Sequence, residues 1–248
     1  MKVLFAGPTL YGTVVPGRRM AGTDIVCLPP AQQGDIARAV LQGATVIGLV
    51  DGRYEDVAAP WHKEILFAID QGVRMLGAAS MGALRAAECA PFGMVAVGVV
   101  AARYLSGEIT DDADVAQIHG PSELGCPPLS EALVNIEATR QAALHAGALS
   151  AADARMLRSS ARQIFFKHRT MRRVIDEAGF SGSKADALLD VLKTHWRDIK
   201  REDAMALVGE MLQDPSARRT PSRAWTFRRP KAWRRFMADL QNSLQETR

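Results

Sequence analysis

The residues between Val73 and Cys89 constrain the fold more than any other part of the sequence. An apolar strand pattern over 73–78 is followed, without a linker, by a helical pattern over 81–89, with Ser80 at the corner. Small residues fill this corner, namely Gly77, Ala78, Ala79, Gly82 and Ala83. Because small side chains let a strand and a helix approach closely, the sequence predicts a buried strand that turns directly into a helix.

Ser80 has two interpretations. The pattern Ala-x-Ser80-x-Gly82 resembles a nucleophile elbow, which holds a hydroxyl at the end of a strand beside the first N–H groups of a helix. Serine is also among the best helix N-caps, which would give Ser80 a structural role only. The helix favours a functional site, because Met81, Arg85 and Glu88 share one face of an otherwise Ala- and Leu-rich segment.

Strand and helix patterns alternate through the preceding residues. Strands are expected at 2–6, 24–28, 45–50 and 73–78, with helices at 32–41, 60–72 and 81–89. Such alternation predicts parallel strands joined by crossover helices, which is an α/β fold.

Polar residues stand at the ends of three expected strands. Gly7 and Thr9 follow the first strand, Asp51 follows the third, and Ser80 follows the fourth. Because ligands bind parallel sheets beyond the carboxyl ends of their strands, we expect these residues to form one site.

Only helical patterns follow Ser130. After this residue, helices are expected at 130–146, 150–170, 183–199, 201–212 and 230–244. Before it, one further helix is expected within 95–105. The change near Pro127-Pro128 predicts an α/β core domain over 1–125 and a helical domain over 126–248. The expected architecture is a parallel-sheet sandwich with crossover helices, followed by an all-helical C-terminal region.

Composition excludes several classes of protein. No apolar run approaches the ~20 residues that span a membrane, and the first apolar run is too short for a secretory signal, so we expect a cytoplasmic location. The three cysteines include no Cys-x-x-Cys pair and indicate neither a disulfide framework nor a zinc site. The turn Gly7–Thr13 lacks the Lys and Ser/Thr of a P-loop, although its N–H groups could face an anion.

An acidic segment offers a candidate metal site. Asp111, Asp112 and Asp114 precede His119, but they lack the spacing and the bidentate Glu of an EF-hand. We favour a solvated acidic loop and expect neither a metal nor another cofactor.

The net charge of +4 belongs to the C-terminal tail. Residues 215–248 hold nine Lys/Arg and two Asp/Glu, so residues 1–214 sum to −3. Cations such as Arg219 and Arg223 alternate there with Trp225 and Trp233. This pattern fits nucleic-acid binding, an acidic protein partner, or a solvated surface, and the last is the most common.

Several strings together resemble the TfuA family over roughly residues 1–120. The most specific are Ser80-Met-Gly-Ala-Leu-Arg-Ala-Ala-Glu88 and Trp61-His-Lys-Glu-Ile65, joined by Gly7-Pro8-Thr9, Pro29-Pro30, Gly34-Asp35, Asp51-Gly52, Phe92-Gly-Met94, Gly98 and Tyr104. Two departures stand out. Ala79 replaces a frequent Ser, and Asp111-Asp-Ala-Asp-Val-Ala116 replaces the usual Asp-Asp-Asp-Glu-Val-Ala, which weakens a metal role for that loop.

The resemblance implies a role beside a YcaO-type, ATP-using enzyme that replaces a peptide carbonyl oxygen by sulfur. TfuA-like proteins are associated with thioamide formation in ribosomally made peptides and with thioglycine installation in methanogens. The implied task is to release sulfide from a thiocarboxylated, ubiquitin-like sulfur carrier. The implied partners are therefore a YcaO-type protein, the carrier and a precursor peptide.

Sulfide release of this kind is acyl transfer, and the residues offer candidates for it. Ser80 would be the nucleophile and His62, at the start of the helix after Asp51, would be the base. Asp51 or Glu64 could orient His62, although a histidine at a helix N-terminus often only bonds a loop carbonyl.

Further residues are candidates for substrate binding. Arg85 could hold the carrier's terminal group by a bidentate contact, or pair with Glu88 as part of the scaffold. The other candidates for substrate binding are Lys63, Gly7, Thr9, Met81, Gly82 and Glu88.

Two other functions stay open. A non-catalytic adaptor could dock the carrier, the peptide and the YcaO-type protein on the same rim. RNA binding through the tail would give a salt-sensitive affinity, lost on removal of residues beyond Pro215.

Overall fold

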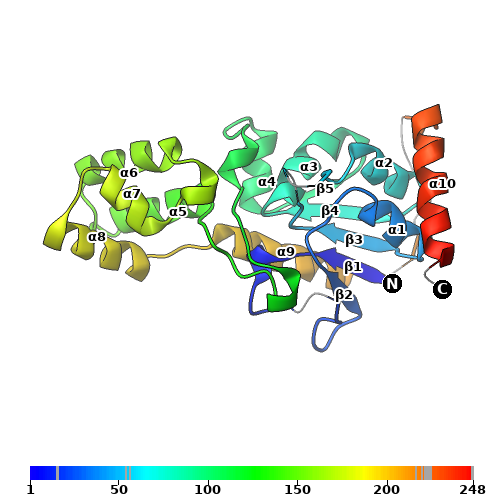
Figure 1. Ribbon diagram of the computed structural model, residues 1–248, viewed down its shortest axis with the longest axis horizontal. Helices are drawn as coiled ribbons and strands as arrows, with labels where there is room; N and C mark the ends of the chain where they lie inside the picture. The colour runs from blue at the N-terminus through cyan, green and yellow to red at the C-terminus, as the bar shows by residue number, and fades with distance from the viewer. Residues whose placement is uncertain are drawn as a thin grey trace.

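The computed structural model describes residues 1–14, 17–53, 55, 57–215, 217–218, 220 and 225–246 (Figure 1). An α/β part and a lobe of helices lie side by side along the longest axis. Of the tail residues named above, Arg219 and Arg223 lie outside the described residues.

A parallel sheet forms the centre of the α/β part. Its five strands run in the order β2-β1-β3-β4-β5. They are β1 (Lys2–Phe5), β2 (Ile25–Leu28), β3 (Val46–Leu49), β4 (Arg74–Ala78) and β5 (Val95–Val97). All neighbouring strands pair in parallel, which confirms the predicted α/β fold. The carboxyl ends of the strands therefore share one edge.

Both faces of the sheet are covered. Val3 and Phe5 pack into one core cluster while Leu4 and Ala6 pack into another, because side chains alternate along a strand. The first cluster includes residues of α1 (Asp35–Leu41), α2 (His62–Asp70) and α3 (Met81–Cys89). The second is completed by α9 (Ile199–Gln213), which crosses the opposite face (Figure 1).

Helix α9 comes from the region expected to form a separate helical domain. Leu207 and Met211 pack directly over Gly48 of β3, where a Cβ would lie 2.7 Å from Leu207 and would overlap with Met211. The division after residue 125 stays a prediction, but α9 is part of the core of the sheet.

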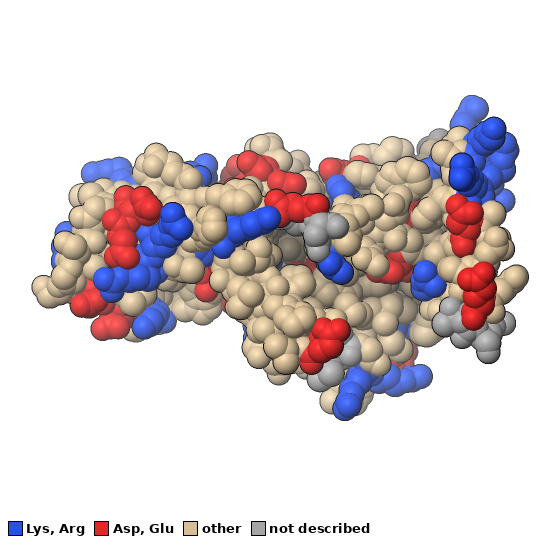
Figure 2. Space-filling view, viewed as in Figure 1, with Lys and Arg blue, Asp and Glu red and all other residues tan. Residues whose placement is uncertain are grey.

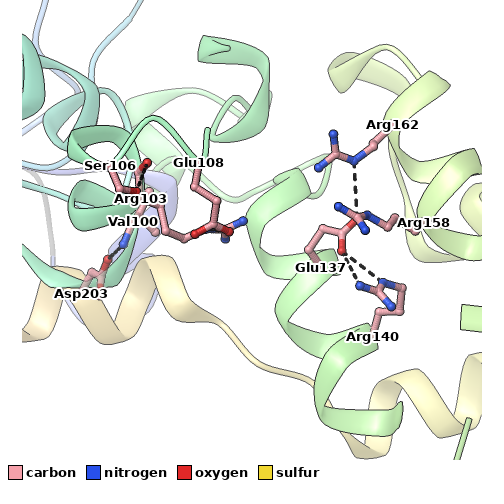
Figure 3. A network of polar contacts seen from close by, with 9 residues as sticks. All are labelled: Val100, Arg103, Ser106, Glu108, Glu137, Arg140, Arg158, Arg162 and Asp203. Carbon is pink, nitrogen blue, oxygen red and sulfur yellow. Dashed lines mark hydrogen bonds and ion pairs between the residues drawn. The ribbon is translucent and has the colours of Figure 1, made fainter. Parts of the chain in front are cut away.

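The fifth strand was not expected from the sequence, whereas a helix was expected within 95–105 and is found there. Val95–Val97 pairs with β4, and α4 (Gly98–Leu105) begins only afterwards. Asp203 of α9 accepts hydrogen bonds from the backbone N–H groups of Val99 and Val100 at the start of α4. Figure 3 shows the bond from Val100. The strand is too short to show a period of its own in the sequence.

The helical lobe has its own apolar core. It consists of α5 (Leu133–His145), α6 (Ala151–Gln163), α7 (Met171–Glu177) and α8 (Gly182–Thr194). The single helix expected at 150–170 is wrong, because α6 ends at Gln163 and Thr170 caps α7 by accepting a hydrogen bond from the N–H of Arg173. The predicted helical region after the sheet is confirmed, with one helix more than expected within 150–180.

Helix α10 (Lys231–Glu246) packs across α1 and α2 at the far end of the α/β part (Figure 1). Trp233 is buried and contacts Phe67 and Phe227, so these tail rings belong to the core and not to an exposed stacking surface. Exposed cations gather over the first turns of α10 (Figure 2). Within the described residues, no helix is both long and apolar enough to cross a bilayer.

Candidate functional site

The corner between β4 and α3 is as compact as its small residues suggest. A Cβ on Gly82 would overlap with the backbone of Leu49, and one on Gly77 would overlap with the carbonyl oxygen of Gly82. Ala79 has a φ of 68°, a conformation that is strained for a residue with a Cβ. The chain therefore turns sharply and places Ser80 at the carboxyl edge of the sheet.

The hydroxyl of Ser80 does not cap the helix. Ser80 occupies the N-cap position of α3 without a capping hydrogen bond from its side chain. Its Oγ instead donates to the carbonyl oxygen of Val115 at 3.5 Å, the long limit of a hydrogen bond. This geometry argues against the interpretation of Ser80 as a cap only.

A pocket of about 620 Å³ opens beside Ser80. Helix α3 lines it with Ser80, Met81, Leu84, Arg85 and Glu88, and the facing segment lines it with Thr110, Asp111, Asp112, Val115 and Ala116. The volume lies in the range typical of ligand sites. Of the predicted site residues, the structure brings Ser80, Met81, Arg85 and Glu88 together at this pocket.

Arg85 supplies a cation to the pocket wall. One Nη donates to Glu88 Oε2 at 2.6 Å, while the buried Nε has no hydrogen-bond partner among the described residues. An unsatisfied buried donor of this kind costs about 1–3 kcal/mol. Both roles predicted for Arg85, pairing with Glu88 and binding an anion, remain compatible with this geometry.

His62 lies with Arg85 and Glu88. Its Nε2 is 2.8 Å from Glu88 Oε2 and 3.3 Å from a guanidinium nitrogen of Arg85. Glu88 is eight residues beyond Ser80 on α3, about 12 Å along the helix axis. The hydrogen bonds found within the described residues therefore place His62 at the far end of α3 and not on the Ser80 hydroxyl.

Asp51 holds the first turn of the chain. Its buried carboxylate accepts hydrogen bonds from the N–H of Gly7 at 2.8 Å, the N–H of Thr9 at 3.1 Å and the hydroxyl of Thr9 at 2.6 Å. These bonds explain why polar residues gather at the strand ends. Asp51, Gly7 and Thr9 therefore stabilise the first turn together. The predicted contact of Asp51 with His62 is wrong, because His62 bonds Glu88 and Arg85.

The other two candidates on α2 point elsewhere. The Glu64 carboxylate is fully buried and accepts from the N–H groups of Gly34, Ala37 and Trp61, so it joins α1 to α2 and does not orient His62. Lys63 Nζ lies 4.1 Å from the centre of the Phe227 ring, beside α10.

The acidic segment forms a wall of the pocket. Asp111 and Asp112 line it, and burial together with the neighbouring Asp111 raises the pKa of Asp112. Within the part of the chain that the structure describes, no group of three or more His, Cys, Asp or Glu is placed to hold a metal ion. The predicted solvated loop is confirmed, because Asp111 and Asp112 are exposed, and both residues also line the pocket.

Some amide donors expected for an oxyanion are already engaged. The N–H of Gly82 donates to Val50 at 3.0 Å, and the N–H of Ser80 donates to Ala78 at 2.8 Å. A nucleophile elbow uses the N–H of the residue after the nucleophile, here Met81, and neither of these two hydrogen bonds involves that group.

Sequence reasoning missed Lys200. This residue lies in the first turn of α9, and its Nζ donates to Val115 at 2.9 Å and to Gln117 Oε1 at 2.6 Å. The carbonyl oxygen of Val115 is the same one that Ser80 contacts. Only 1% of Lys200 is exposed, and burial lowers its pKa. No local sequence pattern identifies Lys200 as a site residue, because it lies 120 positions from Ser80 in the sequence.

A comparison with known protein families finds a match over the part of the chain that holds this site. Residues 51–170 match the family described as TfuA-like protein, a range that includes Asp51, His62, Ser80, Arg85 and Val115. A comparison with curated proteins gives no match. Residues 51–170, just under half of the chain, are therefore similar to the TfuA-like family.

Proposed function

We propose that this protein releases sulfide from the thiocarboxylated C-terminus of a ubiquitin-like carrier and so supplies a YcaO-type partner. The match of residues 51–170 to the TfuA-like family supports an association of the chain with YcaO-dependent thioamidation of peptides. The observation that carries the finer proposal is the Ser80 hydroxyl, which makes no capping bond to α3, lies at a strained corner and lines a pocket together with Arg85.

The proposed reaction proceeds by acyl transfer. Ser80 Oγ attacks the carbonyl carbon of the thiocarboxylate, the C–S bond breaks, and sulfur leaves with the electron pair as HS⁻ after taking up the serine proton. Water then hydrolyses the acyl-serine to the carrier carboxylate and free Ser80. Arg85 lies on the same pocket wall, where a cation stabilises the negative charge of the carrier terminus.

Sulfide release from a purified thiocarboxylated carrier tests the proposal. We expect Ser80→Ala to lower the rate to the uncatalysed level, because no other group replaces the attacking oxygen. Ser106→Ala is the matched control, since Ser106 is exposed on α4 and bonds only its own turn. Full activity of Ser80→Ala would contradict the proposal.

A non-catalytic adaptor is the second candidate. It is favoured by the position of His62, the base expected from the sequence, which bonds Glu88 and Arg85 and not the Ser80 hydroxyl. An adaptor would bind the carrier, a precursor peptide and the YcaO-type protein without releasing sulfide by itself. Stable binding of the carrier without release by the unsubstituted protein would favour this function.

A further inference from the structure

Lys200 and Ser80 converge on one backbone atom. The carbonyl oxygen of Val115 accepts a hydrogen bond from Lys200 Nζ at 2.9 Å and one from Ser80 Oγ at 3.5 Å. The amine nitrogen and the hydroxyl oxygen therefore lie within about two hydrogen-bond lengths of each other. Ser80 lines the pocket, whereas Lys200 is almost fully buried and is not among the residues that line it. The amine therefore lies near the hydroxyl without being exposed to solvent.

The contacts of Lys200 fit a neutral amine. Such an amine has two N–H donors and one lone pair, and the described residues provide two acceptors, the Val115 carbonyl and Gln117 Oε1. A neutral amine can thus satisfy both acceptors and keep its lone pair for a proton. An ammonium would carry a third N–H and a full charge in a place that is almost fully buried.

The charged neighbours of Lys200 oppose this neutral state only in part. Burial is the largest influence and lowers the pKa of Lys200, whereas Asp51, Asp198 and Glu131 raise it. Asp51 is bonded to Gly7 and Thr9, Asp198 accepts from Arg201 N–H, and burial raises the pKa of Glu131 to about 7. The position of Lys200 in the first turn of α9 also disfavours a cation, because the helix dipole is positive there.

We infer that Lys200 is the base that takes the proton of Ser80, which makes the site a serine–lysine pair. The inference rests on the proposed acyl transfer and replaces His62 in the role of base. His62 is bonded to Glu88 and Arg85 at the other end of α3.

The proton balance closes without an added reactant. As the bond from Ser80 Oγ to the carbonyl carbon forms, the proton moves from Oγ to Lys200 Nζ, either directly or through one water. When the C–S bond breaks, the ammonium returns this proton to sulfur, which leaves as HS⁻. The neutral amine then takes a proton from the water that attacks the acyl-serine and passes it to Ser80 Oγ as that ester breaks.

Labelling with a fluorophosphonate probe tests the pair without any carrier. In the unsubstituted full chain, we expect Ser80 to be labelled at a rate that rises with pH as Lys200 loses its proton. Lys200→Met keeps an unbranched side chain and removes the base, so the labelling rate should fall at least ~100-fold. The pH-dependent rise should disappear in the same variant, and a merely structural lysine would not produce that change.

A second variant keeps the lysine, so it tests the serine–lysine pair even if Lys200→Met fails to fold. Gln117→Glu places a carboxylate within hydrogen-bond distance of Lys200 Nζ. This negative charge should raise the pKa of Lys200 and move the rise in labelling to higher pH. An unshifted profile in this variant would overturn the inference, as would absence of labelling in the unsubstituted protein. Lysine-dependent labelling without sulfide release from a thiocarboxylated carrier would support the pair and reject the proposed function.

Discussion

Asp203 of α9 accepts a hydrogen bond of 2.7 Å from the backbone N–H of Val100 in α4 (Figure 3). The same carboxylate accepts from Val99 at 2.8 Å, so it caps a helix that is more than 100 residues distant in the sequence. Gly98 has a φ of 89°, and a Cβ there would overlap with Asp203. This contact joins α9, the helix that carries Lys200, to the start of α4.

Asp203→Ala should therefore destabilise the protein. Loss of a helix cap costs about 0.5–2 kcal/mol, and we expect the upper part of that range because two N–H groups lose their partner. Urea unfolding measures the change. Asp190→Ala is the control, since Asp190 is exposed on α8, and an equal loss in the control would show that the cap is not the cause.

Gly82→Ala tests the close approach of α3 to β3. The added Cβ would overlap with the backbone oxygen of Leu49, which cannot move without breaking the sheet. We expect a loss of more than ~2 kcal/mol in the free energy of unfolding. Gly209→Ala on α9 is the matched control, because nothing lies within 4 Å of its Cβ, and it should stabilise the helix by about 1 kcal/mol. Similar effects of the two substitutions would contradict the packing argument.

The corner at Ser80 and the parallel sheet were predictable from the sequence because their signals are local. Gly77, Gly82 and the apolar run before them specify a tight strand-to-helix turn wherever they occur. The placement of Lys200 was not predictable, because it depends on α9 crossing the sheet, and helical periodicity does not say what a helix packs against. Likewise, His62 and Asp51 were correctly expected near strand ends or helix starts, but their hydrogen-bond partners depend on side-chain directions that spacing does not give.

Glu131 should make stability depend on pH. Burial raises the pKa of this carboxyl group from 4.5 to about 7 in the folded protein. Between these values the folded state binds more protons than the unfolded state, so the free energy of unfolding falls as pH rises. We expect a loss of roughly 1–3 kcal/mol between pH 4.5 and 7.5 from this group. Glu131→Gln should remove that slope, whereas Glu123→Gln, at an exposed position, should keep it.

Glu137 is surrounded by arginines in the helical lobe (Figure 3). Arg140 donates to its Oε2 at 2.8 Å, while Arg158 and Arg162 approach its Oε1 at 3.5 and 3.8 Å. The side chains of Glu137 and Arg140 are only 7% and 8% exposed, so removing the carboxylate leaves a buried cation without its counter-ion.

Glu137→Gln should consequently cost about 3–5 kcal/mol, as expected for a broken buried ion pair. Thermal or urea unfolding measures the loss. Glu177→Gln is the control, because Glu177 pairs with Arg173 at the surface and such pairs contribute at most about 1 kcal/mol. A small effect of Glu137→Gln would mean that water or the remaining charges compensate for the lost carboxylate.

Glu88 and a carrier terminus would compete for Arg85. If Arg85 binds the thiocarboxylate, Arg85→Met should raise the KM for the carrier about tenfold, which corresponds to one charge-assisted hydrogen bond. Glu88→Gln should instead lower KM, because the guanidinium then loses the partner that lies 2.6 Å away. If the pair is only scaffold, both substitutions should lower stability and leave KM unchanged. Opposite shifts of KM in the two variants are therefore the result that assigns Arg85 to substrate binding, and fluorophosphonate labelling of Ser80 in each variant controls for damage to the nucleophile.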